Sequence, residues 1–516
     1  MLNLVVEKSS ISNIPVVIGS LLGLYILVRL TNTQTLKGPI EAGLDLHFLH
    51  KKIVFDTLRN PLNRIPGPRV ARWTNLVHDY YLLKGQQPYY VHNLHKKYGP
   101  IVRISPDRVD ICDAYAVREI HKTHTKFPKT AFYRQLVSGN IHTMFSTTDP
   151  QFHGVRRRLL ASPISDSSLS HLVPQISNRV EYTIQRIAEE INNRGAADIF
   201  KWWLFMATDI IGELSFGESF KMLEAGKPTQ YSMDLARISS LQPVRTTFPT
   251  LIKFGAYLPL PFFKSAAASG KRIGMYAHQS VQRYVNHLAE NPENPKPTLF
   301  TKMFDMEKSG MSQSDIRDEA QGYIVAGSDT TAITLTYLVY SVCKNPEVQT
   351  KLVEELSQLP EPVSDRDLRD LPYLNNIITE TLRLHTAVPF GLPRAVPPEG
   401  AQFNEHVLPG GVTVSTQSYS LHRDPKIFPD PERFKPERWE NTTKEMKDVS
   451  LPFGGGSRIC IGMHLARIEL RLATALFFRR FPEALVSTKE GMNDDDMIMK
   501  CFFLMAPSGH RCLIEG

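Results

Sequence analysis

One stretch of the chain predicts a helix well beyond the usual length. Residues 312–343 keep a helical pattern without a proline, and Ser312 and Asp315 at its start resemble a capping box with Asp in place of Glu. About 30 helical residues extend over about 45 Å, whereas an average helix has about 12 residues. We therefore expect this helix to run through the middle of a globular domain.

The centre of this helix is unusual. Residues 326–331 read AGSDTT. Gly costs about 1 kcal/mol there relative to Ala, and the side chains of Asp and Thr compete for backbone groups. A polar run between the apolar residues Ile324 and Ile333 suggests a functional break. The alternative is a Gly/Thr patch that lets a neighbouring helix pack closely, and the pattern alone favours neither.

The rest of the body, from residue 70 on, is also mostly helical, with short β-like runs such as residues 100–105. No repeat and no Gly/Ser-rich linker divides it. Apolar residues make up 42% and charged residues 22% of the chain, as in an ordinary folded protein. The net charge of +8 is small for 516 residues and does not indicate a nucleic-acid binder.

The amino terminus has the pattern of a membrane anchor. Residues 11–28 contain no charged residue, and about 18 helical residues span about 27 Å, near the hydrocarbon thickness of the endoplasmic-reticulum membrane. The alternative is a cleaved signal peptide, but Glu7 stands in the leading segment and no A-x-A-like site follows. Lys and Arg residues follow the span, so the positive-inside rule places the rest of the chain in the cytosol.

A second segment carries the chemistry. Residues 452–462 read PFGGGSRICIG and precede a helical run. The chain has five cysteines without CxxC spacing, a pattern that does not support a disulfide framework or a structural zinc site. A lone Cys is usually a small buried hydrophobe. Here the amides of a Gly-rich loop, a helix amino terminus and the cation of Arg458 would favour a thiolate at Cys460. That setting suits a thiolate bound to iron.

This segment resembles the haem-binding signature F-x-x-G-x-R-x-C-x-G of the cytochrome P450 family, the haem-thiolate monooxygenases. Every fixed position matches: Phe453, Gly456, Arg458, Cys460 and Gly462. The AGSDTT run resembles the family's oxygen-activation motif on its long central helix. The resemblance implies a mainly α fold with small β-sheets, preceded here by one transmembrane helix.

The resemblance also sets the expected domain bounds. We expect an N-terminal membrane anchor over residues 1–31, and a linker with a proline-rich hinge over residues 32–65. One haem-thiolate catalytic domain would follow over residues 66–516.

Glu380 and Arg383 have the spacing of the family's E-x-x-R motif. Such a pair is usually an exposed ion pair, but the apolar residues around it favour burial here. A third member is expected in a P-E-R-F-like motif. Residues 434–439 resemble F-x-P-E-R-F, with Trp last, so we expect Arg438, with Arg433 as the second candidate. Such a network would brace the cysteine loop.

The resemblance implies roles for further residues. Cys460 would be the axial ligand of the iron of haem b, with Phe453 in the same signature. The haem propionates would be bound by four residues: Arg458, Arg394, and the counterpart of the family's W-x-x-x-R pair, His153 and Arg157. His replaces the usual Trp at position 153, as in filamentous-fungal members.

Asp329 and Thr330 resemble the family's acid–alcohol pair, which relays protons to dioxygen inside a site too apolar for bulk water. Because the pair is present, the resemblance implies an NADPH- and O2-dependent monooxygenase. A reductase-independent haem-thiolate isomerase or dehydratase, or a non-enzymatic haem-binding sensor, remains as the alternative.

The implied electron donor is NADPH–cytochrome P450 reductase, with cytochrome b5 as a further candidate. Basic side chains could form a positive face for an acidic reductase: Arg156, Arg158, Arg467 and Arg471. The implied location is the endoplasmic-reticulum membrane, single-pass, with the catalytic domain facing the cytosol.

The expected substrate is a bulky lipophilic small molecule. Family topology points to residues 129–150, 216–270, 388–392 and 497–505 as pocket-lining regions, which offer the aromatic residues Phe132, Phe390, Phe502 and Phe503. Details such as residues 391–397 resemble fungal members that tailor secondary metabolites. We expect a polyketide, terpenoid or alkaloid intermediate.

Overall fold

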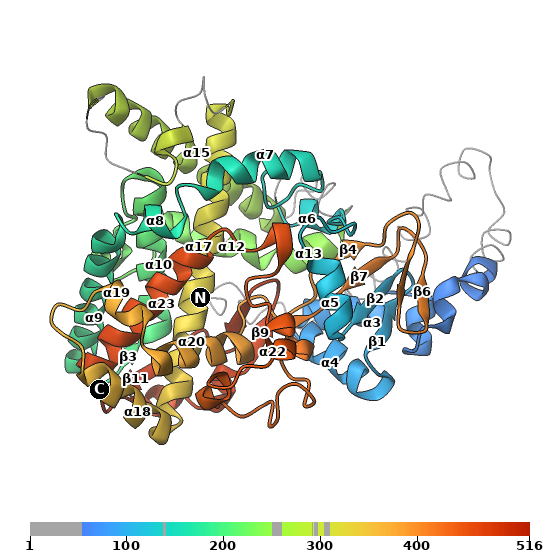
Figure 1. Cartoon of the computed structure of the whole chain (residues 1–516). Helices are drawn as coiled ribbons and strands as arrows, with labels where there is room; N and C mark the ends of the chain where they lie inside the picture. The colour runs from blue at the N-terminus through green and yellow to red at the C-terminus, as the bar shows by residue number, and fades with distance from the viewer. Residues whose placement is uncertain (1–53, 138–140, 250–260, 292, 294–297, 304–309) are drawn as a thin grey trace.

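Helix α17 (Gln313–Cys343) runs through the middle of the molecule, as its length predicts (Figure 1). The computed structural model describes residues 54–137, 141–249, 261–291, 293, 298–303 and 310–516. The predicted capping box is confirmed: the Ser312 hydroxyl accepts from the Asp315 amide at 3.1 Å, and the Asp315 carboxylate accepts from the Ser312 amide at 3.0 Å.

The helix continues without a break through residues 326–331, where the pattern left a functional break and close helix packing equally open. The hydroxyls of Ser328 and Thr330 donate to the carbonyls four residues earlier, at 2.8 and 2.7 Å, so they do not displace backbone hydrogen bonds. A Cβ at Gly327 would lie 3.1 Å from Ile211 Cγ1 of α10 (Ile199–Phe216). The glycine therefore allows the close helix packing that was the alternative.

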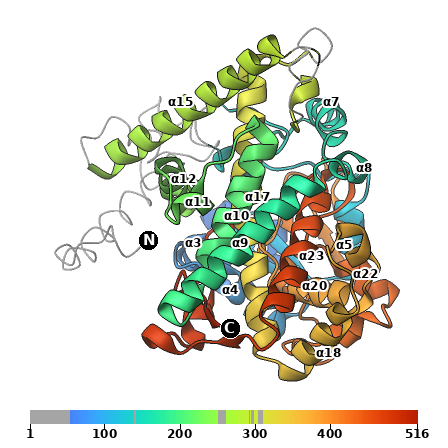
Figure 2. The same ribbon diagram turned by 90° about the vertical axis from the view of Figure 1, so that its left-hand side faces the viewer.

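The other helices surround α17 on several sides. In Figure 2, α10 lies beside it, α9 runs obliquely past α10, and α15 lies across one end of the molecule. Besides α10, the described helices before α17 are α3 (Leu76–Leu83), α4 (Gln87–Tyr98), α5 (Ala114–His121), α6 (Phe132–Gln135), α7 (Pro150–Ala161), α8 (Asp166–Leu169), α9 (Val173–Arg194), α11 (Met222–Ala225), α12 (Gln230–Ser240), α13 (Gln242–Thr247) and α15 (Pro261–Glu290). Those after it are α18 (Pro346–Ser357), α19 (Asp365–Arg369), α20 (Pro372–Leu384), α21 (Ser418–Leu421), α22 (Lys444–Val449) and α23 (Met463–Arg480).

Hydrophobic spacing explains how these helices pack. α9 buries Ile176, Val180, Ile184 and Ile187, which recur every three or four residues and so form one apolar stripe. α10 is apolar around most of its surface and is nearly all buried, because it lies between α9 and α17. The main core is built from α9, α10, α17, α20 and α23.

The sheets are small, and the largest lies on the opposite side of the molecule from α9 and α10 (Figure 1). Its strand order is β1-β2-β7-β4, with β2 and β7 parallel. The strands are β1 (Ile101–Ser105), β2 (Arg108–Ile111), β3 (Ala197–Asp198), β4 (Arg394–Ala395), β5 (Ala401–Phe403), β6 (His406–Leu408), β7 (Thr413–Ser415), β8 (Leu485–Val486), β9 (Met499–Cys501), β10 (Met505–Pro507) and β11 (Leu513–Glu515). The expected mainly α fold with small β-sheets is confirmed, and β1 coincides with the predicted β-like run.

The proline-rich stretch before residue 70 packs against this sheet. It forms two short 3-10 helices, η5 (Pro61–Arg64) and η6 (Arg69–Arg72), and buries Leu62 and Ile65. The Arg103 amide of β1 donates to the Pro66 carbonyl at 2.7 Å. Contacts with the domain therefore begin before residue 66.

The predicted anchor over residues 1–31 and most of the predicted linker lie outside the described residues. Among the residues that are described, no helix is both long enough and apolar enough to cross a bilayer.

Candidate active site

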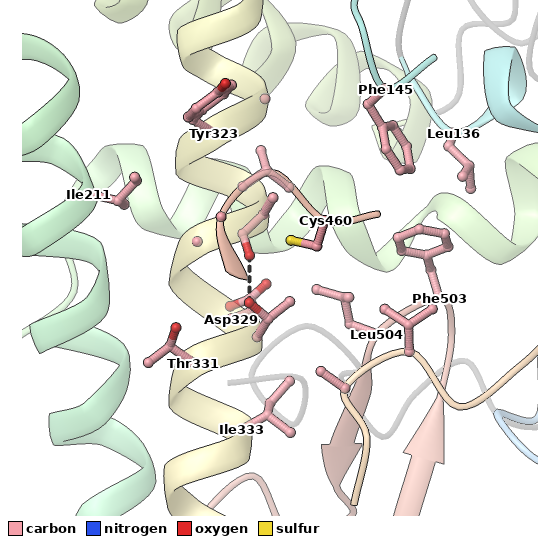
Figure 3. A pocket seen from close by; sticks show the side chains of 18 of the residues that line it. Leu136, Phe145, Ile211, Tyr323, Asp329, Thr331, Ile333, Cys460, Phe503 and Leu504 are labelled. Atoms are coloured by element: carbon pink, nitrogen blue, oxygen red, sulfur yellow. Dashed lines mark hydrogen bonds between the residues drawn. The ribbon is translucent and has the colours of Figure 1, made fainter. Parts of the chain in front are cut away.

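A cavity of about 1290 Å³ lies between α17 and the cysteine loop. Figure 3 shows the sulfur of Cys460 pointing toward α17, the helix that carries Asp329, Thr331 and Ile333. Leu136, Phe145 and Phe503 lie on the other side of Cys460. All the residues named in this paragraph line the cavity, so the segments that the sequence singled out converge on one site.

The cysteine loop needs its glycines for two reasons. Gly454 and Gly456 have φ of +72° and +58°, in the left-handed region that favours glycine. A Cβ at Gly456 would also lie 2.0 Å from the His121 carbonyl oxygen, so no side chain fits there. The Cys460 amide then donates to the Phe453 carbonyl at 2.8 Å, which closes the loop and presents the thiol to the cavity.

The electrostatic setting of the thiol differs from the expectation in one respect. Burial raises the pKa of Cys460, and the Gly462 amide and the charge of Arg157 oppose that rise. Arg458 does not act on the thiol as expected, because its side chain lies beside Arg394 and Tyr133. The loop amide and Arg157 thus favour the thiolate, and a bound metal ion would complete the deprotonation.

Glu380 is the centre of a buried network behind the loop. Its two carboxylate oxygens accept from Arg383 Nε and Nη2, both at 2.8 Å, and the side chains of both residues are fully buried. Arg438 Nε donates to Glu380 at 2.9 Å. The structure thus brings together Glu380, Arg383 and Arg438, whereas the side chain of Arg433 is exposed and only its carbonyl takes part.

Sequence reasoning missed two members of this network. Trp439 Nε1 donates to Glu380 at 2.9 Å, a bond that the family's usual Phe cannot make. His422 accepts from the Leu451 amide at 3.2 Å and contacts the Arg383 carbonyl at 2.9 Å. Burial lowers the pKa of His422 to about 3, so the ring is neutral and Nδ1 donates to Arg383. His422 thereby joins the Glu380 network to the start of the cysteine loop.

A cluster of cations lies on another wall of the cavity. Arg394, on edge strand β4, forms an isolated β-bridge with Lys129. Arg458 lies beside Arg394, and Arg157 donates to the Ile459 carbonyl at 2.7 Å. Burial and the neighbouring cations lower the pKa of Lys129 well below its ordinary value, and that of Arg458 to about 10. The positive charges in this cluster therefore repel one another.

The cluster has the properties of an anion-binding site. Within the described residues, none of Lys129, Arg157, Arg394 and Arg458 forms a salt bridge. Arg394 Nε and the Tyr133 hydroxyl are buried without a hydrogen-bond partner. Buried cations and unsatisfied donors are costly unless a group pairs with them. Two carboxylates would satisfy them, so the residues fit the propionates of haem.

Lys129 and Tyr133 were not predicted as members of this site. His153 lies in the same cluster, where burial and the surrounding cations lower its pKa to about 3, so it is neutral. The sequence offers no clear signal for Lys129, because Lys126 and Arg134 carry the same charge within five residues of it.

Asp329 and Thr330 both line the cavity. Burial raises the pKa of Asp329 to about 6. Thr331, the next residue, turns away from Thr330 and donates to Glu469 of α23 at 2.8 Å. Glu469 was not predicted, and burial raises its pKa to about 8, against the effect of the Thr331 hydrogen bond. Two buried acids therefore lie close to the thiol loop.

The aromatic residues of the cavity differ in part from the prediction. Phe502 and Phe503 line it as predicted, but Phe132 and Phe390 do not. Phe390 packs behind the wall, with its ring centroid 6.0 Å from that of Phe132 and 5.4 Å from that of Phe503. Phe145, in the predicted region 129–150, supplies another ring. Helix α10, which was not predicted to line the cavity, adds the rings of Phe200 and Phe205.

Two members of the predicted positive face are not available to a partner. Arg156 is buried and paired with Asp315 at 3.0 Å. Arg471 is buried and paired with Asp365 at 2.6 Å. The prediction was wrong for these two because each contributes to the packing between helices. Arg158 and Arg467 are exposed.

Comparison with known proteins agrees with this geometry. Residues 66–512 match the family model described as Cytochrome P450. Cytochrome P450 monooxygenase tazI of Aspergillus terreus is 53% identical over 465 residues, which cover 90% of this chain and 95% of the relative. Cytochrome P450 monooxygenase orf2 of Aspergillus niger is 46% identical over 476 residues, 92% and 97% of the two chains.

A third relative, Cytochrome P450 monooxygenase azaI of Aspergillus niger, is 44% identical over 440 residues, 81% of this chain and 94% of the relative. Family membership implies a haem-thiolate cofactor, a redox partner and a small-molecule substrate. The chain therefore belongs to the cytochrome P450 family and is a monooxygenase of that family.

Proposed function

We propose that this enzyme uses NADPH and O2 to oxidise a lipophilic intermediate of secondary metabolism, by hydroxylation, epoxidation or a series of oxidations. One observation carries the proposal. The Cys460 thiol, the acid Asp329 and the hydroxyl Thr330 line a single cavity whose other walls are largely apolar. An apolar cavity with a few polar groups favours a lipophilic ligand.

Haem b would be held by the Cys460 thiolate, which would bind its iron, and by the cation cluster, which would bind its propionates. When bound, the haem iron supplies dioxygen activation, and a thiolate ligand favours O–O cleavage. Arg157, Arg394, Arg458 and Lys129 would neutralise the two propionates, while His153 and Phe453 pack around the site. The Glu380 network would keep the loop rigid, because its buried charges have no alternative partners.

Asp329 and Thr330 would deliver protons in this reaction. Thr330 carries its hydroxyl at the cavity wall, with the Ala326 carbonyl as its acceptor at 2.7 Å. Asp329 has a pKa of about 6 because it is buried, so it can hold a proton near neutral pH and release it. An apolar cavity excludes most water, so proton delivery by the Asp329 and Thr330 side chains matters more here than it would at the protein surface.

The proposed electron donor is NADPH–cytochrome P450 reductase, with cytochrome b5 as a second donor. The exposed cations Arg158 and Arg467 support a docking face for an acidic partner, and Arg467 lies 5.9 Å from the ring centre of Phe453 in the cysteine loop. Attraction between exposed charges weakens with salt. The rate of reduction by the reductase should therefore fall at high ionic strength. The rate of the Arg467→Gln variant should depend less on ionic strength.

The proposed substrate is a polyketide, terpenoid or alkaloid intermediate. The relatives named above are Aspergillus monooxygenases that span nearly the whole chain, which supports a fungal biosynthetic role. The alternative is a reductase-independent isomerase or dehydratase, or a haem-binding sensor. The presence of Asp329 and Thr330 favours a monooxygenase, because an isomerase, a dehydratase or a sensor does not have to protonate dioxygen.

We also propose that residues 1–31 anchor the protein in the endoplasmic-reticulum membrane with residues 66–516 in the cytosol. The support is the uncharged run over residues 11–28 and the basic residues that follow it. Asn441, in a sequon with Thr443, is exposed and should stay unglycosylated in this orientation. A glycan on Asn441 would reverse the proposed topology.

One experiment tests the enzymatic proposal. Full-length holoprotein in membranes is reconstituted with the reductase and screened against lipophilic metabolites for a substrate-induced spin-state shift of the haem. Compounds that shift the spectrum are then incubated with NADPH. We expect substrate-dependent NADPH consumption and an oxygenated product. Product formation without reductase would contradict the proposed dependence on NADPH, and binding without turnover would show that the bound compound is not a substrate.

A further inference from the structure

Arg245 is a cation in the cavity wall that the haem site does not account for. It lies on α13, and Pro243, Val244 and Arg245 all line the cavity. Nη1 donates to the Leu136 carbonyl at 3.1 Å. A guanidinium has five N–H donors. Among the residues that the structure describes, the Leu136 carbonyl is the one acceptor that the Arg245 guanidinium contacts. Most of its N–H groups therefore have no acceptor in this part of the chain.

The other cations of the cavity have partners or a role. The Lys and Arg side chains that line it in the described part of the chain are Lys129, Arg157, Lys201, Arg245, Arg317, Arg394 and Arg458. Lys201 pairs with Glu190 at 2.6 Å, and Arg317 pairs with Asp318 at 2.7 Å. Lys129, Arg157, Arg394 and Arg458 form the propionate cluster. Arg245 is the member of this set that has neither a carboxylate nor a propionate assigned to it.

Arg245 is also electrostatically separate from the propionate cluster. Burial alone lowers the pKa of its guanidinium, with no neighbouring charge contributing. By contrast, Arg394 and Arg458 both lower the pKa of Lys129. An arginine remains charged at neutral pH even when partly buried. The cavity therefore contains an isolated positive charge on a wall away from the cysteine loop.

We propose that Arg245 is a substrate anchor, which binds an ionised acidic oxygen group, such as a carboxylate, of a lipophilic substrate. This inference deepens the proposed function and rests on it. A planar guanidinium can hold a carboxylate through two parallel hydrogen bonds, which fixes the orientation as well as the position of the ligand. Leu136, Phe145 and Phe503 lie on one side of Cys460 in Figure 3, and the Phe145 and Phe503 rings are 6.1 Å apart. They offer an apolar surface for the rest of the molecule.

The anchor explains how a large apolar cavity can select the atom to be oxidised. Apolar contacts alone distinguish weakly between orientations of a lipophilic molecule. A charge-assisted hydrogen bond to Arg245 would hold the acidic end of the substrate at α13. The number of atoms between that acidic group and each carbon would then decide which carbon lies next to the haem iron held by Cys460. The anchor is thus a specificity-determining residue and takes no part in the bond-breaking steps.

The test uses matched pairs of ligands with ferric holoprotein at pH 8: decanoic acid against decanamide, and 2-naphthoic acid against 2-naphthamide. Kd is measured from the spin-state shift for the wild type, Arg245→Met and Arg245→Lys. Wild type should bind each acid about tenfold or more tightly than its amide. Arg245→Met should bind both members of a pair alike, with its amide Kd unchanged, and Arg245→Lys should retain part of the preference.

Lys201→Met is the matched control, because it removes a cavity-lining cation that already has a carboxylate partner. It should keep the acid preference. Equal affinity of the wild type for acid and amide would overturn the anchor but not the proposed function. An equal loss of affinity for acid and amide in Arg245→Met would also overturn it, because the hydrogen bond to Leu136 would then have a purely structural role. If neither series binds although the ferrous–CO spectrum is normal, the lipophilic substrate class fails and the anchor fails with it.

Discussion

The Thr331 hydroxyl donates a hydrogen bond of 2.8 Å to the carboxyl group of Glu469, and both side chains are buried. Thr331 follows Asp329 and Thr330 on α17, whereas Glu469 lies on α23, the helix that begins just after Cys460. This one bond therefore links the helix with the proton-delivery residues to the helix that continues the cysteine loop. Any shift of one helix against the other would break it.

Glu469→Gln should change the pH dependence of stability. The folded protein holds the Glu469 proton up to about pH 8, whereas an unfolded chain releases it near the ordinary pKa of 4.5. The unfolded state then binds fewer protons in this interval, so the free energy of unfolding of the wild type falls as pH rises from about 4.5 to 8. Gln keeps the acceptor for Thr331 but cannot ionise.

We therefore expect the melting temperature of Glu469→Gln, relative to wild type, to rise between pH 5 and pH 8, measured by circular dichroism on the holoprotein. Glu469→Leu removes the acceptor and should be less stable than wild type at pH 5. A difference between Gln and wild type that is the same at both pH values would show that Glu469 does not titrate in this interval.

Thr330→Ala should uncouple NADPH consumption from product formation. Loss of the hydroxyl removes a proton donor from the cavity wall, so product formation should fall about tenfold or more, while hydrogen peroxide per NADPH rises. The substrate-induced spin-state shift should be unchanged. Thr336→Ala is the control, because its hydroxyl also donates to the carbonyl four residues earlier but is fully buried in the core. Equal coupling in both variants would exclude the proposed role.

Arg438→Leu and Arg433→Leu should differ strongly. Removal of Arg438 leaves Glu380 with one guanidinium partner in place of two, and stranding buried charge costs roughly 3–5 kcal/mol. The variant should melt earlier and retain less haem. Arg433 has an exposed side chain, so its replacement should change stability by less than about 0.5 kcal/mol. Thermal melting and the haem-to-protein absorbance ratio measure both effects, and similar losses in the two variants would contradict the assignment.

Lys129→Met should weaken haem retention. The ammonium group is buried beside Arg394 and Arg458, and it donates to the Phe145 carbonyl at 2.6 Å. If it also neutralises a propionate, its loss should speed haem transfer to excess apomyoglobin by about tenfold. That factor corresponds to the free energy of one charge-assisted hydrogen bond. Lys201→Met, which loses a cation paired with Glu190, should transfer haem at the wild-type rate. An unchanged rate in Lys129→Met would remove Lys129 from the propionate site.

Cys460→His should abolish monooxygenase activity and shift the ferrous–CO absorption away from the position characteristic of thiolate ligation. Imidazole is a neutral ligand and cannot push electron density onto the iron as a thiolate does. Cys343→Ala is the control, because Cys343 is buried at the end of α17, and its spectrum should stay of the thiolate type. A thiolate-type spectrum in Cys460→His would identify another cysteine as the ligand.

Much of the site could be predicted from short runs of sequence. Helix α17 and its capping box follow from spacing that repeats within a few residues, and the Gly-rich loop follows from backbone angles that few residues other than glycine adopt. Glu380 and Arg383 are three residues apart on one helix, so their contact is a consequence of helical geometry. Such features depend on neighbours in the chain.

Other features depend on which distant segments pack together. Two P-E-R motifs lie a few residues apart, and the sequence favoured Arg438 only through the resemblance of residues 434–439 to F-x-P-E-R-F. The packing of η8 (Pro436–Trp439) against α20 is the physical reason that Arg438 reaches Glu380. Arg156 and Arg471 read as surface charges, but Asp315 and Asp365 approach them in the fold and they are buried. Phe132 and Phe390 read as cavity residues and pack one layer behind its wall.

The chain's local patterns were sufficient for the long central helix, the cysteine loop and the family of the catalytic domain. They were silent on the bond between Thr331 and Glu469, on the meeting of Lys129 with Arg394, and on the isolated charge of Arg245. Periodicity and glycine content constrain backbone angles over a few residues. Burial, by contrast, is a property of the assembled core, and it decides which carboxyl groups keep their protons and which cations lack a partner.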